Sequence, residues 1–310
     1  MIEFQQVSKT FDNWKAVDDL NLRLNAGDFT VLIGPSGSGK STTLKMINRL
    51  VEHDSGRILF AGKEIRSFKE EDIRRRMGYA IQSIGLFPHW TVEQNIATVP
   101  ALLKWPKARV VERVTELLTL LNLEPARYRQ RYPHQLSGGQ QQRVGVARAL
   151  AADPEVLLMD EPFGALDPVT RSALQAEIAR IHKASGKTIV LVTHDIDEAL
   201  LLADRIVLLD KGRIAQVGTP FEILAHPASD FVTEFVGRSE VGIKLLGLDT
   251  VGARVRKGQS ATGEPLPISA TLREALSAFV ARRASSLPVV DAQGQPVGAL
   301  HFADLLDEQA

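Results

Sequence analysis

The segment Gly34-Pro35-Ser36-Gly37-Ser38-Gly39-Lys40-Ser41 constrains the fold of this chain more than any other stretch. It fits the pattern G-x-x-x-x-G-K-[ST] and lies between a β-like run over 30–33 and a helical stretch that begins at Thr42. Glycines let backbone N–H groups turn inward around phosphate oxygens, and the helix N-terminus adds partial positive charge. Lys40 supplies a full positive charge, and the Ser41 hydroxyl is placed to hold Mg²⁺. A flexible Gly/Ser loop is the alternative, but the strand before it and the helix after it favour a nucleoside triphosphate site.

An acidic pair closes a second apolar run. Residues 156–159 are apolar and are followed by Asp160 and Glu161. A buried parallel strand delivers side chains to the C-terminal edge of its sheet in this way. We expect Asp160 to hold Mg²⁺ through water and Glu161 to orient or deprotonate the attacking water. A solvated strand end is the alternative, and the phosphate loop upstream favours the functional interpretation.

Composition limits the classes of partner. The chain has 310 residues, 44% hydrophobic and 24% charged, which is typical of a globular protein of about two domains. Its 37 Lys and Arg balance its 37 Asp and Glu, so no net field attracts nucleic acid, and no nucleic-acid partner is expected. There is no Cys, which excludes disulfides and thiolate metal sites. Residues 1–4 do not begin the basic and then apolar pattern of a signal peptide, and no apolar stretch approaches the ~20 residues of a membrane span. We therefore expect a soluble or peripheral cytoplasmic protein.

The order of the expected elements indicates an α/β fold. Residues 2–26 and 57–65 are expected to form short strands of a small antiparallel layer beside the phosphate loop. Helices are expected over 107–123 and 170–184, and further strands over 189–193 and 205–209, which is the alternation of a parallel sheet. After about residue 238 the pattern changes to a loop over 258–267, a helix over 271–283 and a strand over 287–290. The end of the chain is therefore expected to be a separate small αβ domain.

A third motif runs from Leu136 to Gln140. Ser137 is the natural N-cap of a helix expected over 140–151, and two glycines follow it. A capped helix start is one interpretation. The other is a second anion site about a hundred residues after the first, because the first helical N–H groups and the Ser137 hydroxyl are available. Two phosphate sites for one nucleotide would imply a partner copy.

With these motifs in this order, residues 1 to about 236 closely resemble the ATP-binding subunits of ABC transporters. The resemblance implies a P-loop NTPase core with a mostly parallel sheet, an antiparallel β layer and a helical subdomain. It also implies a head-to-tail homodimer in which each ATP lies between the phosphate loop of one copy and the signature of the other. The signature residues are Leu136, Ser137, Gly138, Gly139 and Gln140.

The same resemblance assigns roles to four further residues. It implies that Phe11 stacks on adenine, that Gln82 binds Mg²⁺ and water and senses the membrane subunit, that Asp167 lies in the loop crossing the dimer, and that His194 contacts the γ-phosphate. Each has an alternative. Phe11 fits a core position, Gln82 a polar strand end, Asp167 a turn before Pro168, and His194 a strand-end histidine with local partners.

The runs 45–52 and 79–88 look most like the ATPases of importers for glycine betaine, choline or proline-like osmoprotectants. The resemblance implies integral membrane permease subunits, indirectly a periplasmic or lipid-anchored solute-binding protein, and a peripheral place on the cytoplasmic face of the inner (plasma) membrane. The apolar segment 83–92 is expected either to belong to the core or to form a groove for a short permease helix. An importer of another small solute, such as an amino acid, and a soluble ABC ATPase without a membrane partner remain alternatives.

The C-terminal residues 266–310 resemble a single CBS motif. A helix opens at 270–275, and the runs 286–291 and 297–298 flank Gly294 as strand, turn and strand. The expected domains are an ATP-binding domain over 1–236, a linker with a strand-like lead-in over 237–265, and the CBS-like domain over 266–310. CBS motifs work in pairs and residues 240–310 have room for one, which leaves pairing across the homodimer as one option.

Overall fold

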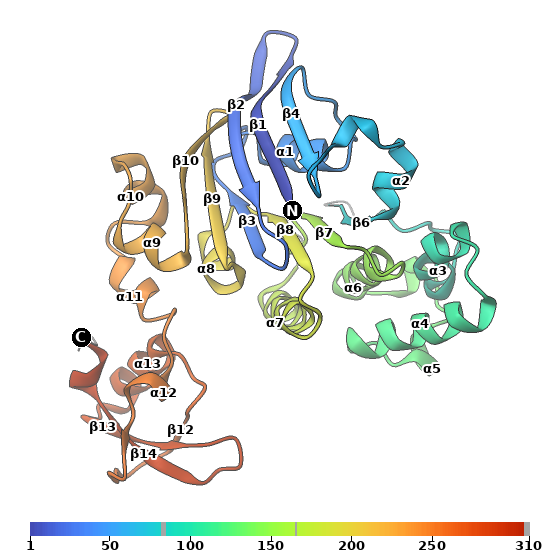
Figure 1. Cartoon of the computed structure of the whole chain (residues 1–310). Helices are drawn as coiled ribbons and strands as arrows, with labels where there is room; N and C mark the ends of the chain where they lie inside the picture. Colours follow the sequence, from blue (N-terminus) through green and yellow to red (C-terminus); the bar gives the residue numbers. More distant parts are fainter. Residues whose placement is uncertain (82–84, 165, 307–310) are drawn as a thin grey trace. The chain divides into compact units, whose positions relative to one another are not determined.

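The computed structural model describes residues 1–81, 85–164 and 166–306. By their internal contacts these residues divide into two compact units, Met1–Val217 and Gly218–Ala310 (Figure 1). Within the described residues, no helix combines the length and the apolar character that crossing a bilayer requires.

An antiparallel sheet with the order β2-β1-β4-β5 forms one layer of the first unit. Its strands are β1 (Ile2–Phe11), β2 (Trp14–Leu24), β4 (Ser55–Phe60) and β5 (Lys63–Glu64). Ile2 pairs with Leu24 and with Phe60, and all three side chains are buried, so alternate residues of each strand face one core. The expected antiparallel layer is confirmed, although β1 and β2 are long strands. The stretch expected over 57–65 divides into β4, β5 and a short 3₁₀ helix, η1 (Ile65–Ser67).

A six-stranded sheet with the order β10-β9-β3-β8-β7-β6 carries the site. Its strands are β3 (Phe29–Ile33), β6 (Met77–Ala80), β7 (Val156–Asp160), β8 (Thr188–Val192), β9 (Arg205–Asp210) and β10 (Arg213–Gly218). The pairs β3–β8, β3–β9, β6–β7 and β7–β8 are parallel. Every residue of β3, β7 and β8 is buried, as expected for strands covered on both faces. Their carboxyl ends meet at one edge, because Leu32 and Asp160 both pair with Val192.

Four helices flank this core: α1 (Lys40–Ile47), α2 (Glu70–Arg75), α7 (Pro168–Ser185) and α8 (Ile196–Leu202). α1 contacts β2 as well as β7 and β8, so it lies between the antiparallel layer and the parallel sheet (Figure 1). The helix expected over 170–184 is confirmed as α7, which begins two residues earlier because the Asp167 side chain caps it.

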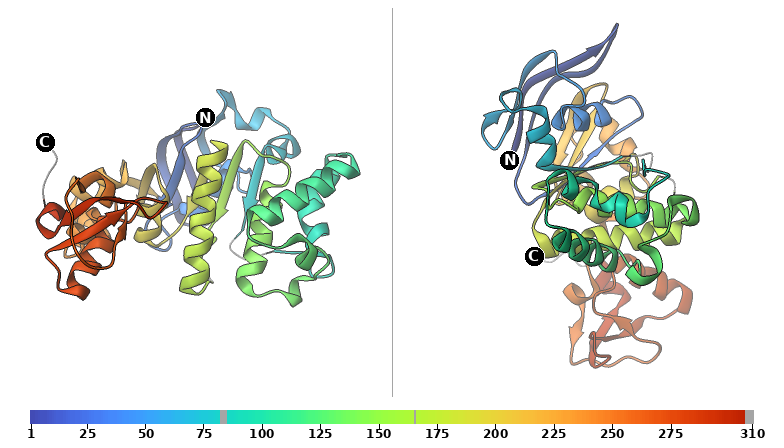
Figure 2. Two further views of the ribbon diagram at one scale, coloured as in Figure 1. Left: turned by 90° about the horizontal axis from the view of Figure 1, so that it is seen from below. Right: turned by 90° about the vertical axis from the view of Figure 1, so that its right-hand side faces the viewer.

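A helical region lies beyond the β6 edge of the parallel sheet (Figures 1 and 2). It contains α3 (Val92–Leu102), α4 (Lys107–Leu120), α5 (Pro125–Tyr128), η2 (Pro133–Gln135) and α6 (Gly138–Leu150). α3 and α6 contact each other, and α6 also contacts β6. The helix expected over 107–123 ends earlier, at Leu120, where the chain turns through Asn122 at φ 54°. The helix expected over 140–151 begins at Gly138, directly after its cap Ser137.

The second unit has its own core. Its elements are α9 (Pro220–Ala225), α10 (Asp230–Val236), α11 (Val241–Leu245), α12 (Val251–Arg254), β11 (Arg256–Lys257), β12 (Leu266–Pro267), α13 (Leu272–Arg282), β13 (Ser286–Val290), β14 (Pro296–His301) and η3 (Phe302–Leu305). The sheet order is β11-β14-β13-β12, and α13 packs its Phe279 into the core with Leu287 and Leu300. The expected small αβ arrangement is confirmed. Within 237–265, α11 and α12 precede β11, so helix occupies more of this segment than the strand-like lead-in expected there.

Candidate functional site

The phosphate loop lies at the carboxyl end of β3, the central strand between β8 and β9. Gly39, at φ 98°, precedes the first residue of α1, and Gly34 has φ 148°. A Cβ at Gly34 would lie 2.1 Å from the Leu209 carbonyl oxygen, and one at Gly39 would lie 2.3 Å from that of Ala16. Neighbouring backbone therefore leaves room only for glycine at both positions.

Lys40 points into this loop. Its ammonium donates hydrogen bonds to the carbonyl oxygens of Gly34 and Pro35, each at 2.8 Å. Burial lowers the pKa of the Lys40 ammonium, although the negative charges of Glu161 and Asp160 act in the opposite direction. The buried cation is thus held at the loop by neutral carbonyls, where it can bind an anion.

The loop also contains a polar atom that suits a phosphate. Ser38 is 2% exposed, and its buried hydroxyl oxygen has no hydrogen-bond partner among the described residues. Unpartnered buried hydroxyls are costly unless a ligand or water satisfies them. The Ser38 hydroxyl could therefore donate to a phosphate oxygen. Gly34 and Gly39, which have no side chains, leave the loop backbone free to approach the same triphosphate.

Ser41 and Asp160 bring two oxygen groups together beside the loop. The Ser41 hydroxyl donates to Asp160 Oδ1 at 2.8 Å, and the Tyr79 hydroxyl donates to Asp160 Oδ2 at 3.4 Å. Burial, followed by the negative charge of Asp160, raises the pKa of the Tyr79 phenol well above its usual range, so Tyr79 stays a donor. Hydroxyl and carboxylate oxygens suit Mg²⁺. Gln82, the third expected Mg²⁺ ligand, lies outside the described residues.

Glu161 and His194 face each other across neighbouring strand ends. His194 Nδ1 lies 3.5 Å from Glu161 Oε2, and the His194 side chain is 62% exposed. Glu161 has φ 47°, a conformation that non-glycine residues rarely adopt, and its backbone N–H donates to the Val192 carbonyl oxygen at 3.0 Å. The strand ends thus hold a carboxylate beside an imidazole, as expected for a pair acting on a water molecule.

Phe11 ends β1 and pairs with Trp14 at the start of β2. Both rings are exposed, which excludes the core position considered for Phe11. Trp14 lies close to the phosphate loop, since its ring would be 3.9 Å from a Cβ at Gly37. The sequence analysis did not select Trp14 as a residue near the loop, because a single Trp within a strand belongs to no motif.

The segment Leu136 to Gln140 forms a capped helix start. Ser137 Oγ accepts from the Gln140 backbone N–H at 3.4 Å, and Gln140 Oε1 accepts from the Ser137 N–H at 3.0 Å. Leu136 is buried, whereas Gly138 has open space where a Cβ would lie. The cap uses the third helical N–H, so it leaves the N–H groups of the first two helical residues for an anion.

The expected dimer loop lies beside this helix start. A Cβ at Gly139 would lie 2.2 Å from the Thr170 Cγ2 atom on α7. Asp167 caps α7, its Oδ1 accepting from the backbone N–H groups of Val169 at 3.2 Å and Thr170 at 3.1 Å. Hydrogen bonds from Thr170 and then from Val169 lower the pKa of Asp167. Asp167 is therefore a helix cap as well as a candidate contact residue.

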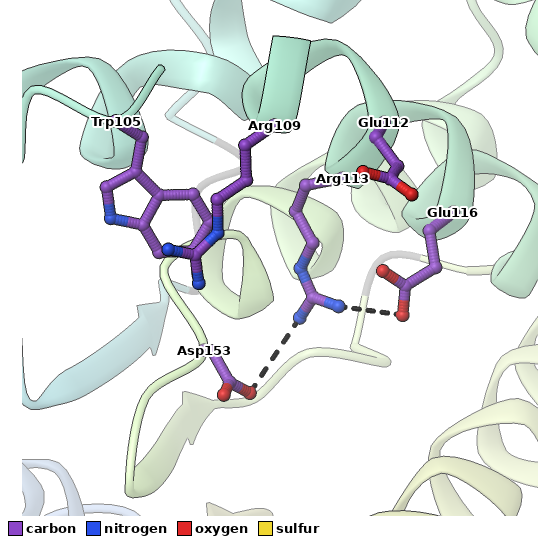
Figure 3. Close-up of a pocket in the computed structure, with 6 residues that line it drawn as sticks. All are labelled: Trp105, Arg109, Glu112, Arg113, Glu116 and Asp153. Atoms are coloured by element: carbon purple, nitrogen blue, oxygen red, sulfur yellow. Dashed lines mark hydrogen bonds and ion pairs between the residues drawn. The ribbon is translucent and has the colours of Figure 1, made fainter. Parts of the chain in front are cut away.

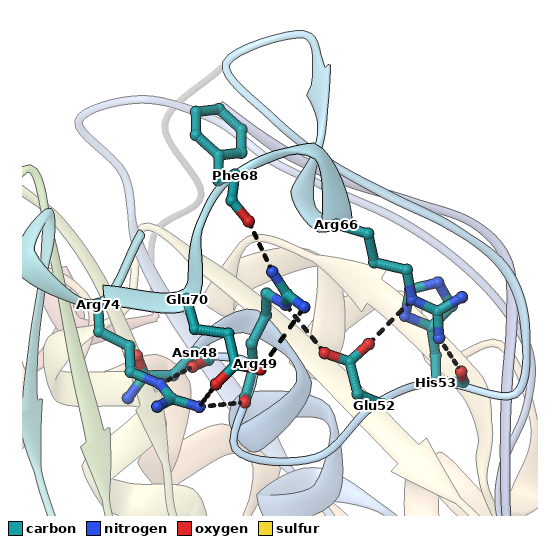
Figure 4. A network of polar contacts seen from close by, with 8 residues as sticks. All are labelled: Asn48, Arg49, Glu52, His53, Arg66, Phe68, Glu70 and Arg74. Atoms are coloured by element: carbon teal, nitrogen blue, oxygen red, sulfur yellow. Dashed lines mark hydrogen bonds and ion pairs between the residues drawn. The ribbon is translucent and has the colours of Figure 1, made fainter. Parts of the chain in front are cut away.

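A polar network holds the far end of α1 (Figure 4). Arg74 on α2 donates to the carbonyl oxygens of Asn48 at 3.3 Å and Arg49 at 2.7 Å, and Arg49 donates to the Phe68 carbonyl oxygen at 2.8 Å. The guanidinium of Arg74 thus satisfies carbonyls at the helix C-terminus. Contacts between residues this far apart in the chain leave no sequence pattern, so the sequence analysis did not predict this role of Arg74.

A separate cavity of ≈ 410 Å³ lies on α4 (Figure 3). The Arg109 guanidinium lies over the Trp105 ring, 3.7 Å from its centroid, and Arg113 reaches Glu116 at 2.8 Å and Asp153 at 4.0 Å. None of the expected site residues lines this cavity. Within it Arg113 pairs with two of the three carboxylates. The residues expected to bind the nucleotide lie at the sheet edge instead.

Comparison with known proteins bears on both units. Residues 17–164 match the family model described as ABC transporter, and residues 265–310 match the CBS domain model. The glycine betaine uptake system ATP-binding protein YehX of Escherichia coli K12 is 67% identical over 99% of this chain and 100% of its own length. The glycine betaine/carnitine/choline transport ATP-binding protein OpuCA of Bacillus subtilis is 51% identical over 94% of this chain and 76% of its own.

Solved structures agree with the first unit. The dimeric structure of the bacterial ABC transporter cassette MJ0796 matches with a TM-score of 0.65 at 34% identity, covering 71% of this chain and 99% of that one. Its dimeric post-hydrolysis state bound to ADP and Pi matches with the same TM-score of 0.65 at 33% identity and the same coverage.

Proposed function

We propose that this chain, which belongs to the ATP-binding subunits of ABC transporters, powers the uptake of an osmoprotectant such as glycine betaine. The observation that carries the proposal is its 67% identity, over 99% of its length, to a glycine betaine uptake ATP-binding protein. The proposal is supported by the positions of Asp160, Glu161 and His194, which follow neighbouring strands at the sheet edge that carries the phosphate loop. The solute itself would contact other subunits, so its identity rests on the relatives.

The phosphate loop would bind the triphosphate. Backbone N–H groups of the segment 34–41, in which Pro35 has none, would surround the phosphates together with Thr42 in the first turn of α1. Lys40 would exchange its carbonyl partners for phosphate oxygens. Phe11, exposed at the end of β1, would stack on the adenine ring. Its neighbour Trp14 would limit the space beside the loop.

Ser41, Gln82 and Asp160 would hold Mg²⁺, Ser41 through its hydroxyl and Asp160 through water. When bound, Mg²⁺ neutralises the charge that develops on the phosphate oxygens. The Ser41–Asp160 hydrogen bond of 2.8 Å supports this assignment because it places both oxygens beside the loop. Tyr79 would orient the Asp160 carboxylate.

Glu161 would position the attacking water and accept its proton, and His194 would contact the γ-phosphate. The separation of 3.5 Å between His194 Nδ1 and Glu161 Oε2 supports a shared task at one phosphate. Glu161 also has a left-handed backbone, at φ 47°, and such strained conformations cluster at active sites.

The signature start would complete the pocket of a second copy. In a head-to-tail homodimer, the open N–H groups at Gly138 and Gly139 and the Ser137 hydroxyl would bind the partner's γ-phosphate, and Asp167 would contact the partner near that site. A triphosphate bound by both copies favours closure, and its hydrolysis permits reopening. The dimeric relatives support this arrangement.

Permease subunits would receive this motion at the helical region, and a periplasmic or lipid-anchored solute-binding protein would deliver the cargo to them. The chain would then be peripheral on the cytoplasmic face of the inner membrane. We propose an ATP-binding domain over 1–236, a linker over 237–265 and the CBS domain over 266–310. In the homodimer, the CBS motifs of the two copies would pair with each other and form a regulatory domain.

The test compares Glu161→Gln with Glu155→Gln. Glu155 directly precedes the other end of β7 and pairs with Arg76 at the surface, so it is a matched control. In cells lacking this chain and other betaine importers, wild type and Glu155→Gln should restore uptake of labelled glycine betaine, and Glu161→Gln should not. Purified Glu161→Gln should retain ATP and run as a nucleotide-bound dimer in size-exclusion chromatography.

Three outcomes would contradict parts of the proposal. Unchanged hydrolysis by Glu161→Gln would remove Glu161 from its role. Uptake of a labelled amino acid in place of betaine would assign another solute. Full activity of a cytosolic dimer that never co-purifies with a permease would favour the soluble class of ABC ATPase.

A further inference from the structure

A buried carboxylate that the proposed reaction does not use lies behind His194. Glu198 on α8 is 5% exposed. The Thr193 hydroxyl donates to its Oε2 at 2.6 Å, and Gln175 Nε2 on α7 donates to its Oε1 at 3.2 Å. Burial raises the pKa of the Glu198 carboxyl, and the hydrogen bond from Thr193 opposes the shift. Both oxygens therefore accept hydrogen bonds, as a buried carboxylate requires.

These bonds hold the backbone on both sides of His194. The Thr193 N–H donates to the Leu32 carbonyl oxygen at 3.2 Å, and the Asp195 N–H donates to Thr193 Oγ1 at 3.1 Å. The Thr193 hydroxyl thus joins the residue after His194 to Glu198. Because the imidazole is itself largely exposed, its position depends on this backbone.

Arg171 extends the contacts to the loop of Asp167. Its Nη1 lies 3.7 Å from Asp195 Oδ2, its Nε lies 4.0 Å from Glu198 Oε1, and its Nη2 donates to the Leu166 carbonyl oxygen at 3.4 Å. The buried Nε has no hydrogen-bond partner among the described residues. Beside it lies a cavity of ≈ 40 Å³ bordered by Glu161, His194 and Glu198, large enough for one water molecule.

We propose that Glu198 is a positioning residue that holds His194 through Thr193 and joins it, through Arg171, to the loop carrying Asp167. This inference rests on the proposed role of His194 at the γ-phosphate. The hydrogen bonds printed for the Glu198 carboxylate come from Thr193 and Gln175, and neither residue belongs to the phosphate loop. Thr193 meets the strand before that loop only through its backbone bond to Leu32, which a change at Glu198 leaves in place. Loss of Glu198 should therefore slow hydrolysis without weakening ATP binding.

The experiment measures ATP hydrolysis and ATP binding by the full chain. Glu198→Ala should lower kcat about tenfold while the Kd for ATP changes less than about twofold, because a misplaced group loses transition-state contacts first. Glu198→Gln retains an acceptor oxygen for Thr193 and should recover most of the loss. In a His194→Ala background, Glu198→Ala should have almost no further effect, since a residue acting through His194 cannot add to its removal.

Glu177→Ala is the matched control. Glu177 on α7 is similarly buried, at 7% exposed, and its carboxylate accepts a hydrogen bond from Asn122 Nδ2 at 2.8 Å. This contact does not involve His194 or its neighbours, so Glu177→Ala should leave kcat unchanged. If Glu198→Ala fails to fold, Thr193→Val removes the same link and should give the same kinetics. An equal fall in kcat with and without His194 would overturn the positioning role alone. Full turnover by His194→Ala would overturn both that role and the proposed function of His194.

Discussion

At the scale of single residues, the phosphate loop is shaped by its neighbours as much as by its own sequence. The carbonyl oxygens of Leu209 and Ala16 approach the Cα atoms of Gly34 and Gly39 so closely that no side chain fits. Gly37 also has a positive φ, 79°, but meets only the Trp14 ring at 3.9 Å. The glycines of the motif are therefore required for different physical reasons.

This difference predicts unequal effects of two alanine substitutions in the loop. Gly39→Ala should destabilise the first unit by about 2 kcal/mol and abolish ATP binding, because left-handed strain adds to a backbone clash. Gly37→Ala bears the strain without the clash and should be milder in both measurements. Calorimetric ATP titration and thermal unfolding check this. Equal losses in the two variants would show that the carbonyl contact is not the cause.

At the scale of elements, α1 is held at both ends. Its N-terminus forms the phosphate loop, and Arg74 on α2 donates to carbonyl oxygens at its C-terminus. α2 leads directly into β6, so the same contact ties the nucleotide helix to the strand that precedes Gln82. A cation at the C-terminal end of a helix also interacts favourably with the helix dipole.

Arg74→Met should therefore lower the free energy of unfolding of the first unit by about 1 kcal/mol, a modest value because the side chain is 39% exposed. Arg75→Met is the matched control. Arg75 lies on the same helix, and its ion pairs among the described residues, with Glu71 and Asp72, are exposed. Denaturant unfolding followed by tryptophan fluorescence measures both variants. If Arg75→Met costs as much as Arg74→Met, the bonds to the α1 carbonyls contribute nothing.

At the scale of the whole molecule, the two units have separate cores and separate optical signals. The three tryptophans, Trp14, Trp90 and Trp105, all lie in the first unit. In the second unit, the Asp304 side chain is 4% exposed. Its carboxylate accepts hydrogen bonds from Arg256 Nε at 3.0 Å and from the His301 backbone N–H at 2.9 Å. Burial opposes ionisation of Asp304, but these hydrogen bonds outweigh it and hold its pKa below the usual range.

A depressed carboxyl pKa stabilises the folded unit at pH values above about 4 and loses that contribution as the pH falls through the folded-state pKa. The second unit should therefore unfold at a lower temperature in acid, and Asp304→Asn should flatten this dependence. Circular dichroism follows both units, whereas tryptophan fluorescence follows only the first. Glu264→Gln, which breaks the exposed pair with Arg282, should keep the wild-type profile. An identical acid response in Asp304→Asn would contradict the assignment.

The local motifs were predictable because each depends on neighbours in the chain. The strand–loop–helix around Gly34 to Ser41, the Ser137 cap and the acidic end of β7 all follow from adjacent residue types. The boundary of α4 was overestimated because apolar periodicity continues to residue 121, while the left-handed turn at Asn122 does not show in that pattern.

The sequence by itself determined the phosphate loop, the alternation of strands and helices, and the small C-terminal αβ unit, because these depend on short-range propensity and spacing. Only the tertiary structure decided which strand ends meet. It brought Ser41 to Asp160, Glu161 to His194, and Glu198 behind them, although these residues are separated by up to 157 positions. Long-range packing, which satisfies buried polar groups, selects these contacts, and no local pattern records it.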